Sequence, residues 1–300
     1  MLIFQIIRKI HIKIAIVTDS NSGITQKEAQ ELGITVIPMP FLIDGEEYFE
    51  DINLSQSEFY EKLNSGAEVS TSQPSIFSVT ETWDKLLKTY DQIIHIPMSS
   101  GLSGSTESAK TKAAEYNGKV FVIDNKRISV TQKQSVLDAI NMVHDGKTAK
   151  DIAEWLEKTG GESSIYIMLT TLKYLKKGGR ITPAAAALGT LFKIKPILTI
   201  QGGKLDKFHQ VISYAQGKNK MIEQVAKELA SRFKASVSSG KFKVFVAHTN
   251  IEAKALEFEK EINSAFEKFN LKVEFVNPLS LSVACHIGDG SLAIAASICY

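Results

Sequence analysis

A stretch rich in glycine and serine is the first part of the sequence that could do chemistry. It runs from Ile96 to Ala109 and reads IPMSSGLSGSTESA, so that six of the eight residues after the proline are glycine or serine. A loop of this kind that leads into a helix presents free backbone N–H groups and the positive end of the helix dipole, which together suit an anion. A turn that only caps a helix and binds nothing is the alternative explanation.

Known phosphate and nucleophile motifs do not fit this stretch. SGLSGS lacks the G-x-G-x-x-G of a dinucleotide loop, and GLSGS has serine where a nucleophile elbow, G-x-S-x-G, needs its last glycine. A GKT triplet occurs within residues 141–148, but Asn141 replaces the first glycine of a phosphate loop and the stretch before the triplet looks helical. We interpret this triplet as chance, so the nature of the anion stays open.

Three further stretches combine polar groups with glycine or alanine. Residues 70–75 (STSQPS) place hydroxyls before a proline, a pattern that alone is more often a helix cap than a site. Residues 172–189 contain a basic turn, two glycines and a Thr-Pro helix start followed by four alanines, which indicate tight helix packing or room for an apolar ligand. Residues 285–294 (CHIGDGSLAI) place His286 beside a glycine-rich turn, where a lone histidine is usually structural.

Strands alternate with helices in the first half of the chain. We predict strands at residues 13–20, 93–100 and 119–124, and helices near residues 25–32, 55–64, 75–89 and 103–116. This order predicts a parallel sheet with helices on both faces, an α/β/α domain. Ligands of such sheets gather at the carboxyl ends of the strands, where Asp19, Ser20 and residues 99–105 lie.

The second half of the chain predicts a mixed-sheet α/β domain. Its predicted elements are strands at 163–169, 195–205, 241–249, 272–277 and the closing SLAIAASI, with a long helix near 214–235 and another before the 272–277 strand. A length of 300 residues also favours two domains. We therefore predict an N-terminal domain of residues 1–160, with a core of 13–160, and a C-terminal domain of residues 161–300. The cleft between them is the natural pocket.

Composition narrows the function classes. The 35 lysines and arginines nearly balance the 33 aspartates and glutamates, which does not favour nucleic acid or an anionic membrane as a partner. Cys285 and Cys299 are too few for a disulfide framework and match no zinc spacing, so we expect no metal site and a reducing, cytoplasmic location. Residues 1–12 are too short for a membrane span and wrong for a signal peptide, which leaves a leader or a strand extension, or a membrane-surface anchor.

Taken in order, these stretches resemble the DegV family of bacterial fatty-acid-binding proteins. The matching features are VTDS near the start, TSQPS, SSGLSGS, YLKKGGRI, IKPIL and a histidine-glycine turn near the end, and they cover residues 13–300. The series TSQPS, SSGLSGS and KKGGRI in this spacing is more specific than any of its parts.

The resemblance implies two α/β domains that clasp one long-chain fatty acid between them. Carried over onto this chain, Thr71, Ser103 and His286 would bind the carboxylate, with the acyl tail buried. Ser72, Gly104 and Arg180 would support the charge or a nearby interface. The family further implies a carrier that is not itself an enzyme and needs no cofactor. It would present the fatty acid to a partner kinase that forms the acyl phosphate, with transient membrane contact as a further expectation.

Two positions depart from the family pattern. The last turn reads HIGDG, which places Asp289 where proline is usual, and a carboxylate there would weaken an anion site unless it points to solvent. Val211, Ile212 and Ser213 occupy the neighbourhood in which the family tends to carry an arginine. If that arginine helps to dock the kinase, this chain would bind lipid and serve a different partner.

Two other functions compete with the lipid carrier. Ser103, His286 and Asp19 are the residue types of a serine hydrolase acting on lipid esters, although the nucleophile elbow is missing. A small-anion or sugar-phosphate binding module would rest on the glycine-serine loop alone. The sequence does not define the acyl chain length, the protein partner or the oligomeric state.

Overall fold

The structure is a computed structural model that describes residues 12–188 and 194–300. In the described part of the first half, four parallel strands form one sheet in the order β2-β1-β6-β7. These strands are β1 (Ile14–Asp19), β2 (Thr35–Ile37), β6 (Gln92–Ile96) and β7 (Val120–Val122). The parallel sheet that the sequence predicts is therefore confirmed.

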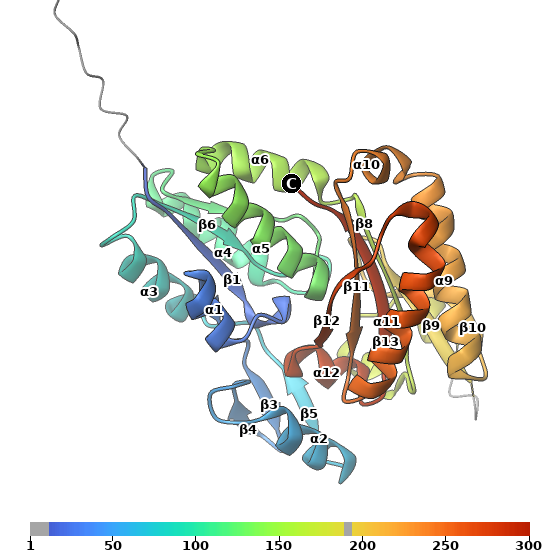
Figure 1. The fold of residues 1–300 in the computed structure, drawn as a ribbon. Helices are drawn as coiled ribbons and strands as arrows, with labels where there is room; N and C mark the ends of the chain where they lie inside the picture. The colour runs from blue at the N-terminus through green and yellow to red at the C-terminus, as the bar shows by residue number, and fades with distance from the viewer. Residues whose placement is uncertain (1–11, 189–193) are drawn as a thin grey trace, which may run out of the picture.

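Helices cover both faces of this parallel sheet (Figure 1). One face packs against α1 (Gln26–Leu32), α5 (Ser129–His144) and α6 (Ala149–Thr159), and the other against α3 (Ile76–Leu86) and α4 (Ser105–Ala113). The alternation of side chains along β1 explains the two faces, because Ile16 points toward α5 while Ala15 and Val17 point toward α3. The GKT triplet lies in the turn between α5 and α6, where Thr148 caps α6.

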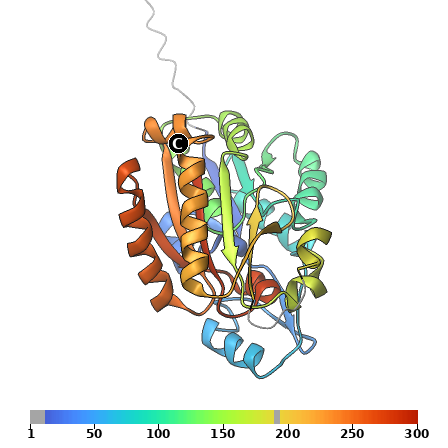
Figure 2. The same cartoon turned by 90° about the vertical axis from the view of Figure 1, so that its right-hand side faces the viewer.

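The second half forms a mixed sheet with the order β10-β9-β8-β13-β11-β12 in its described residues. Its strands are β8 (Ser163–Met168), β9 (Lys195–Ile200), β10 (Asp206–Val211), β11 (Phe242–His248), β12 (Val273–Pro278) and β13 (Leu292–Ile298). Helices α9 (Tyr214–Ala230) and α11 (Glu252–Phe266) pack on its outer face. The inner face turns toward the first half of the chain (Figures 1 and 2).

Two elements of the second half differ from the prediction. Residues 195–205 form the strand β9 followed by a turn. The chain then reverses and returns as the antiparallel strand β10, because Gly202 adopts a φ of 90° in the turn. The helix predicted to residue 235 ends at Ala230, because Ser231 leaves the helical region with a φ of −122° and a ψ of −95°. A short helix, α10 (Lys234–Ser238), follows it.

A small third sheet projects from the first half and was not predicted. It contains β3 (Phe41–Ile43), β4 (Glu46–Tyr48) and β5 (Val69–Thr71), and α2 (Gln56–Asn64) packs on it. Strands of three residues are too short to show a period of two, so the sequence pattern does not predict them. The small sheet and α12 (Leu281–Ile287), near the end of the chain, share one core.

The remaining short elements are η1 (Ser20–Ser22), η2 (Ala114–Tyr116), η3 (Glu267–Phe269), α7 (Lys173–Gly178) and α8 (Pro183–Ala186). Thr182 caps α8 and Pro183 is its first residue, as the sequence predicts. Across residues 12–188 and 194–300, no helix is long and apolar enough to cross a membrane. The predicted boundary at 160/161 falls between α6 and β8 and stays a prediction, and the leader of residues 1–12 lies almost entirely outside the described residues.

Candidate functional site

An apolar cavity lies where the inner face of the mixed sheet meets the carboxyl edge of the parallel sheet. Ile165 and Ile167 of β8 line it from one side, and Met98 and Leu102 line it from the other. The cavity offers about 90 Å³ to the centres of water molecules. A single water needs roughly 10–15 Å³ by that measure, so the cavity has room for several. The pocket that the sequence placed between the two halves is therefore present.

Thr71 and His286 meet at one end of this cavity. A hydrogen bond of 2.8 Å joins Thr71 Oγ1 to His286 Nε2. Thr71 ends β5 and His286 belongs to α12, so the shared core of the small sheet and this helix sets their positions. Leu281 and Cys285 of α12 pack into that core, which turns the opposite face of the helix, with His286, toward the cavity.

The imidazole of His286 is neutral near neutral pH. Burial, which is the larger cause, and the positive charge of Arg180 together lower the pKa of His286 to about 4. A neutral imidazole carries one N–H donor and one acceptor, so His286 can donate to an anion while it accepts from a neighbour. The ring lies against Gly178, where a Cβ would collide with His286 Nδ1. The first glycine of KKGGRI therefore makes room for the close approach of the histidine.

Arg180 joins the polar end of the cavity to the glycine-serine loop. Its guanidinium donates to the carbonyl oxygen of Leu102 at 3.3 Å and to that of Gly178 at 2.5 Å. Because Arg180 also lines the cavity and is half-buried, its charge faces the place that an anionic group would occupy. The side chain is held by both stretches that the resemblance singled out.

Ser103 lines the same end of the cavity, and its Oγ accepts from the backbone N–H of Ser105 at 3.2 Å. Ser72 and Gln73 line the cavity while they are exposed to solvent, which marks this end as the mouth. Gly104 does not line the cavity. A Cβ at Gly104 would lie 3.2 Å from Gln73 Oε1, so this glycine serves the packing of the two loops. The structure thus brings five of the six predicted site residues together, and their role in binding stays a prediction.

The first residues of the glycine-serine loop hold the two halves together. Ser99 Oγ donates to the carbonyl oxygen of Gly202 at 3.1 Å. A Cβ at Gly101 would stand only 2.8 Å from Gly203 Cα in the turn after β9. The hydroxyls of the loop therefore divide between a junction, at Ser99, and the cavity, at Ser103.

The carboxylate of Asp289 is occupied by amide donors. It accepts from Asn64 Nδ2 at 2.9 Å and from Asn250 Nδ2 at 3.3 Å, and it does not line the cavity. These bonds tie the end of α2 to the last turn of the chain. Because the Asp289 carboxylate lies outside the cavity and is hydrogen-bonded to two amides, it repels an anion in the cavity less than the sequence suggests.

The three residues of the hydrolase alternative do not form a triad. The buried carboxylate of Asp19 accepts from the backbone N–H groups of Met98 at 2.7 Å and Asn21 at 3.0 Å, and burial raises the pKa of Asp19 to about 6. In the described part of the chain, no hydrogen bond joins Asp19, Ser103 and His286. Nor does any group of three His, Cys, Asp or Glu side chains there stand ready to hold a metal.

Sequence reasoning missed several cavity residues. Asn21, Ser129 and Ser282 line the cavity, yet each stands alone in the sequence without a pattern of its own, and Gln73 lies in STSQPS, where the hydroxyls drew the attention. The alanine-rich stretch favours tight packing, because Ala185 is fully buried in the core that also contains Leu175 and Leu198 and does not line the cavity. Gly189, at its end, lies outside the described residues.

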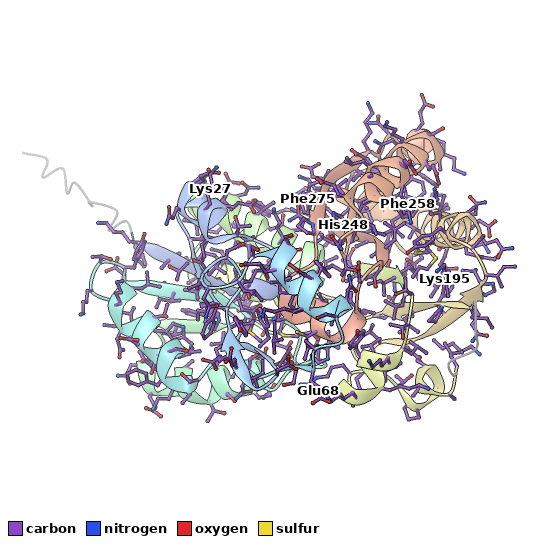
Figure 3. All side chains as sticks on the ribbon, turned by 90° about the horizontal axis from the view of Figure 1, so that it is seen from below. Lys27, Glu68, Lys195, His248, Phe258 and Phe275 are labelled. Carbon is purple, nitrogen blue, oxygen red and sulfur yellow. The ribbon has the colours of Figure 1, made fainter. Side chains whose placement is uncertain are left out.

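A surface ion pair joins the small sheet to the second half of the chain. Lys177 Nζ of α7 lies 3.4 Å from a carboxylate oxygen of Glu68, next to β5. Figure 3, a view from below, shows Glu68 where the small sheet meets the α7–α8 segment. Both side chains are exposed, so the pair adds little to the free energy of folding and serves as a marker of the contact.

The fold and the cavity define an α/β protein in which a parallel sheet and a mixed sheet flank an apolar cavity with a polar mouth. The chain belongs to the DegV family. The family model described as "Uncharacterised protein, DegV family" matches residues 13–298.

Relatives and solved structures of this family match over nearly the whole chain. A DegV domain-containing protein of Halalkalibacterium halodurans is 30% identical over 286 residues, which covers 94% of this chain and 98% of that protein. The fold is similar to that of DegV from Bacillus subtilis, described as a fatty acid binding protein, with 27% identity, a TM-score of 0.82 and coverage of 96% and 99% of the two chains. A DegV family protein from Thermus thermophilus, described by its fatty acid binding, has 27% identity, a TM-score of 0.81 and coverage of 96% and 100%.

Proposed function

We propose that this protein binds one long-chain fatty acid, with the tail in the apolar cavity and the carboxylate at its polar end. The observation that carries the proposal is the hydrogen-bonded pair of Thr71 and His286 at the mouth of a cavity with apolar walls. Ser103 and Arg180 add a hydroxyl and a positive charge at the same end. The fatty acid binding described for the Bacillus subtilis and Thermus thermophilus proteins supports the same ligand class.

The chemistry of the ligand matches that of the walls. A carboxylate has two acceptor oxygens, and hydroxyls with a donating imidazole satisfy them without a metal. Each charge-assisted bond contributes roughly 1.5–3 kcal/mol. Burial of each methylene contributes about 0.8 kcal/mol, so a dozen give on the order of 10 kcal/mol before the costs of association. The tail supplies most of the affinity and the head group supplies the orientation.

In this proposal the protein is a carrier and the chemistry is done by a partner. A kinase would phosphorylate the bound carboxylate, and the acyl phosphate would stay in the carrier until it is consumed in phospholipid synthesis, in a cytoplasmic setting with transient membrane contact. The separation of Asp19 from the Thr71–His286 pair supports a binding role over hydrolysis. Ile212, in the neighbourhood where the family tends to carry an arginine, is 67% exposed. If that arginine helps to dock the kinase, this chain would serve a different partner.

Extraction of the purified protein tests the proposal. The protein is denatured and extracted with organic solvent, and the extract is analysed by mass spectrometry beside that of an unrelated protein from the same host. We expect a near-stoichiometric fatty acid from this protein alone. An empty organic extract, together with failure of added palmitate to bind the ligand-free protein, would contradict the proposal. A water-soluble anion retained instead would favour the small-anion module.

A further inference from the structure

A second polar patch faces the cavity, apart from the groups that would hold a carboxylate. It consists of Asn21 from η1, Ser129 from the start of α5 and Ser282 from α12, and all three line the cavity. Their exposed fractions are 2%, 7% and 5%. Polar groups buried in an apolar wall cost free energy unless they are hydrogen-bonded. The patch therefore favours a ligand that brings a polar atom to it.

Ser129 is the member of the patch whose hydroxyl is free to meet a ligand. Within 12–188 and 194–300 no hydrogen bond joins this hydroxyl to another residue, and Ser129, which lines the cavity, is 7% exposed as a residue. Ser129 is also the first residue of α5, a helix of 16 residues whose cap residue, Ile128, makes no side-chain capping bond. The first N–H groups of a helix have no partner within the helix, so the start of α5, where Ile128 and Ser129 line the cavity, has spare backbone donors.

Asn21 has spare donor capacity as well. Its Oδ1 accepts from Ser282 Oγ at 2.5 Å, whereas its Nδ2 donates to the thioether sulfur of Met98 at 2.9 Å. A thioether is a weak acceptor, so the amide gains if a ligand oxygen replaces or supplements that contact. Together the patch offers amide donors and two hydroxyls that can both donate and accept.

The patch lies close to the proposed carboxylate site. Ser282 and His286 are four residues apart on the cavity face of α12, a separation of about 6 Å along the helix. Gln132, one turn along α5 from Ser129, donates to the Asp19 carboxylate at 3.3 Å, and the N–H of Asn21 donates to the same oxygen at 3.0 Å. Asn21 thus lies between Ser282 and the start of α5, and a chain of a few methylene groups spans the distance from the head group.

We infer that the cavity accepts a hydroxy fatty acid whose hydroxyl is carried on the part of the chain nearest the carboxylate. This inference rests on the proposed function and names its ligand class. The ligand hydroxyl accepts from Asn21 Nδ2 or Ser129 Oγ and donates to Ser282 Oγ or Ser129 Oγ. A plain acyl chain places methylene groups against the patch, so that Ser129 Oγ gains no partner and Asn21 Nδ2 keeps only the weak thioether acceptor. A hydroxyl at the far end of the chain lies against the apolar wall.

Calorimetric titration of the ligand-free protein with three ligands of one length tests the inference. The ligands are palmitate, β-hydroxypalmitate and ω-hydroxypalmitate, the last being the matched control with its hydroxyl at the far end. We expect β-hydroxypalmitate to bind at least as tightly as palmitate and about tenfold more tightly than ω-hydroxypalmitate, which corresponds to about 1.4 kcal/mol. In Ser129→Ala and Ser129→Gly, we expect most of that tenfold preference to be lost.

The two variants distinguish the effect of the missing Ser129 hydroxyl on binding from the effect of a changed backbone conformation. Ser129 has a φ of 57°, a conformation that glycine adopts without strain, so a loss of preference shared by both variants reports the missing hydroxyl. Equal affinity of the wild type for the two hydroxy acids would overturn the inference and leave the proposed function standing, because palmitate would still bind. A preference that persists in both variants would overturn it too. Failure of all three ligands to bind would overturn the proposed function itself.

Discussion

A pair of half-buried polar residues sets the chemistry of the site. Thr71 and His286 are hydrogen-bonded to each other, and the low pKa of about 4 keeps the imidazole neutral near neutral pH. A neutral pair costs far less to bury than a charged one, which favours the neutral imidazole at the mouth of an apolar cavity. An anion placed beside His286 would raise the pKa of the imidazole, since an opposite charge favours the protonated form.

Thr71→Val removes one donor from the head-group site while it keeps the shape of the side chain. We expect the affinity for palmitate to fall by roughly 10- to 150-fold, because a charge-assisted bond contributes about 1.5–3 kcal/mol. The affinity for the uncharged methyl ester of palmitate should change much less. The measurement is calorimetric titration with both ligands.

Thr111→Val on α4 is the matched control for this substitution. Its Oγ1 donates to the carbonyl oxygen of Glu107 on the outside of the helix, and the residue does not line the cavity. Equal losses for the acid and the ester in Thr71→Val would show that the threonine does not contact the carboxylate.

Helix α12 is the element that connects the site to the rest of the fold. Its inner residues pack on the small sheet, and its other face carries Ser282 and His286 into the cavity. Glu50 holds the start of this helix, since it accepts from the backbone N–H of Leu281 at 2.8 Å and from Gln56 Nε2 at 2.7 Å. The small sheet thereby determines where the histidine stands.

Glu50 makes the stability of this element depend on pH. Burial raises the pKa of Glu50 from 4.5 to about 7. Because the folded protein binds this proton more tightly than the unfolded chain does, the stabilisation is complete below about pH 4.5 and is lost as the pH rises through about 7. Between about pH 5 and about pH 8, we expect the melting temperature of Glu50→Gln to fall less than that of the wild type. The two falls should differ by ~2–6 °C.

Thermal unfolding at several pH values checks this prediction. The exposed Glu47→Gln on β4 is the control, since it removes one carboxylate from the same small sheet. Asp19, whose pKa burial raises to about 6, contributes a slope of the same sign in every variant and cancels in the comparison. Parallel pH profiles for the wild type and Glu50→Gln would rule out Glu50 as the source.

The whole molecule depends on a close contact between its two halves. The glycine-serine loop of the first half lies against the turn after β9, with Gly101 facing Gly203. Lys133 of α5 lies over the ring of Phe275 of β12 at 4.9 Å from its centre, and Figure 3 shows Phe275 at the same junction. The cavity is enclosed only because these contacts bring the two sheets together.

Gly101→Ala tests how tightly the halves are joined. The added Cβ would stand 2.8 Å from Gly203 Cα, so the loop or the turn must move. Forced overpacking costs roughly 1–3 kcal/mol, and we expect a lower melting temperature together with weaker fatty acid binding. Gly203→Ala is the matched control, because a Cβ there meets no atom within 4 Å. Similar melting temperatures for Gly101→Ala and the wild type would show that the contact is not restrictive.

The sequence by itself determined the strands and helices whose patterns are long enough to read. The apolar runs of β1, β6 and β8 and the caps of α3 and α8 are visible locally, and the strand patterns suffice to predict a parallel and a mixed sheet. The series TSQPS, SSGLSGS and KKGGRI also identified the family that the match over residues 13–298 confirms.

Only the tertiary structure decided which polar groups share a surface. Thr71 and His286 are 215 residues apart, so no local pattern relates them. Two serines of one loop differ in their contacts. Ser99 donates to the carbonyl oxygen of Gly202 in the turn after β9, whereas Ser103 lines the cavity. Ser129 faces the cavity because α5 starts at the carboxyl edge of the parallel sheet, against the inner face of the mixed one. Side-chain burial depends on which elements meet, and that is a property of the folded chain.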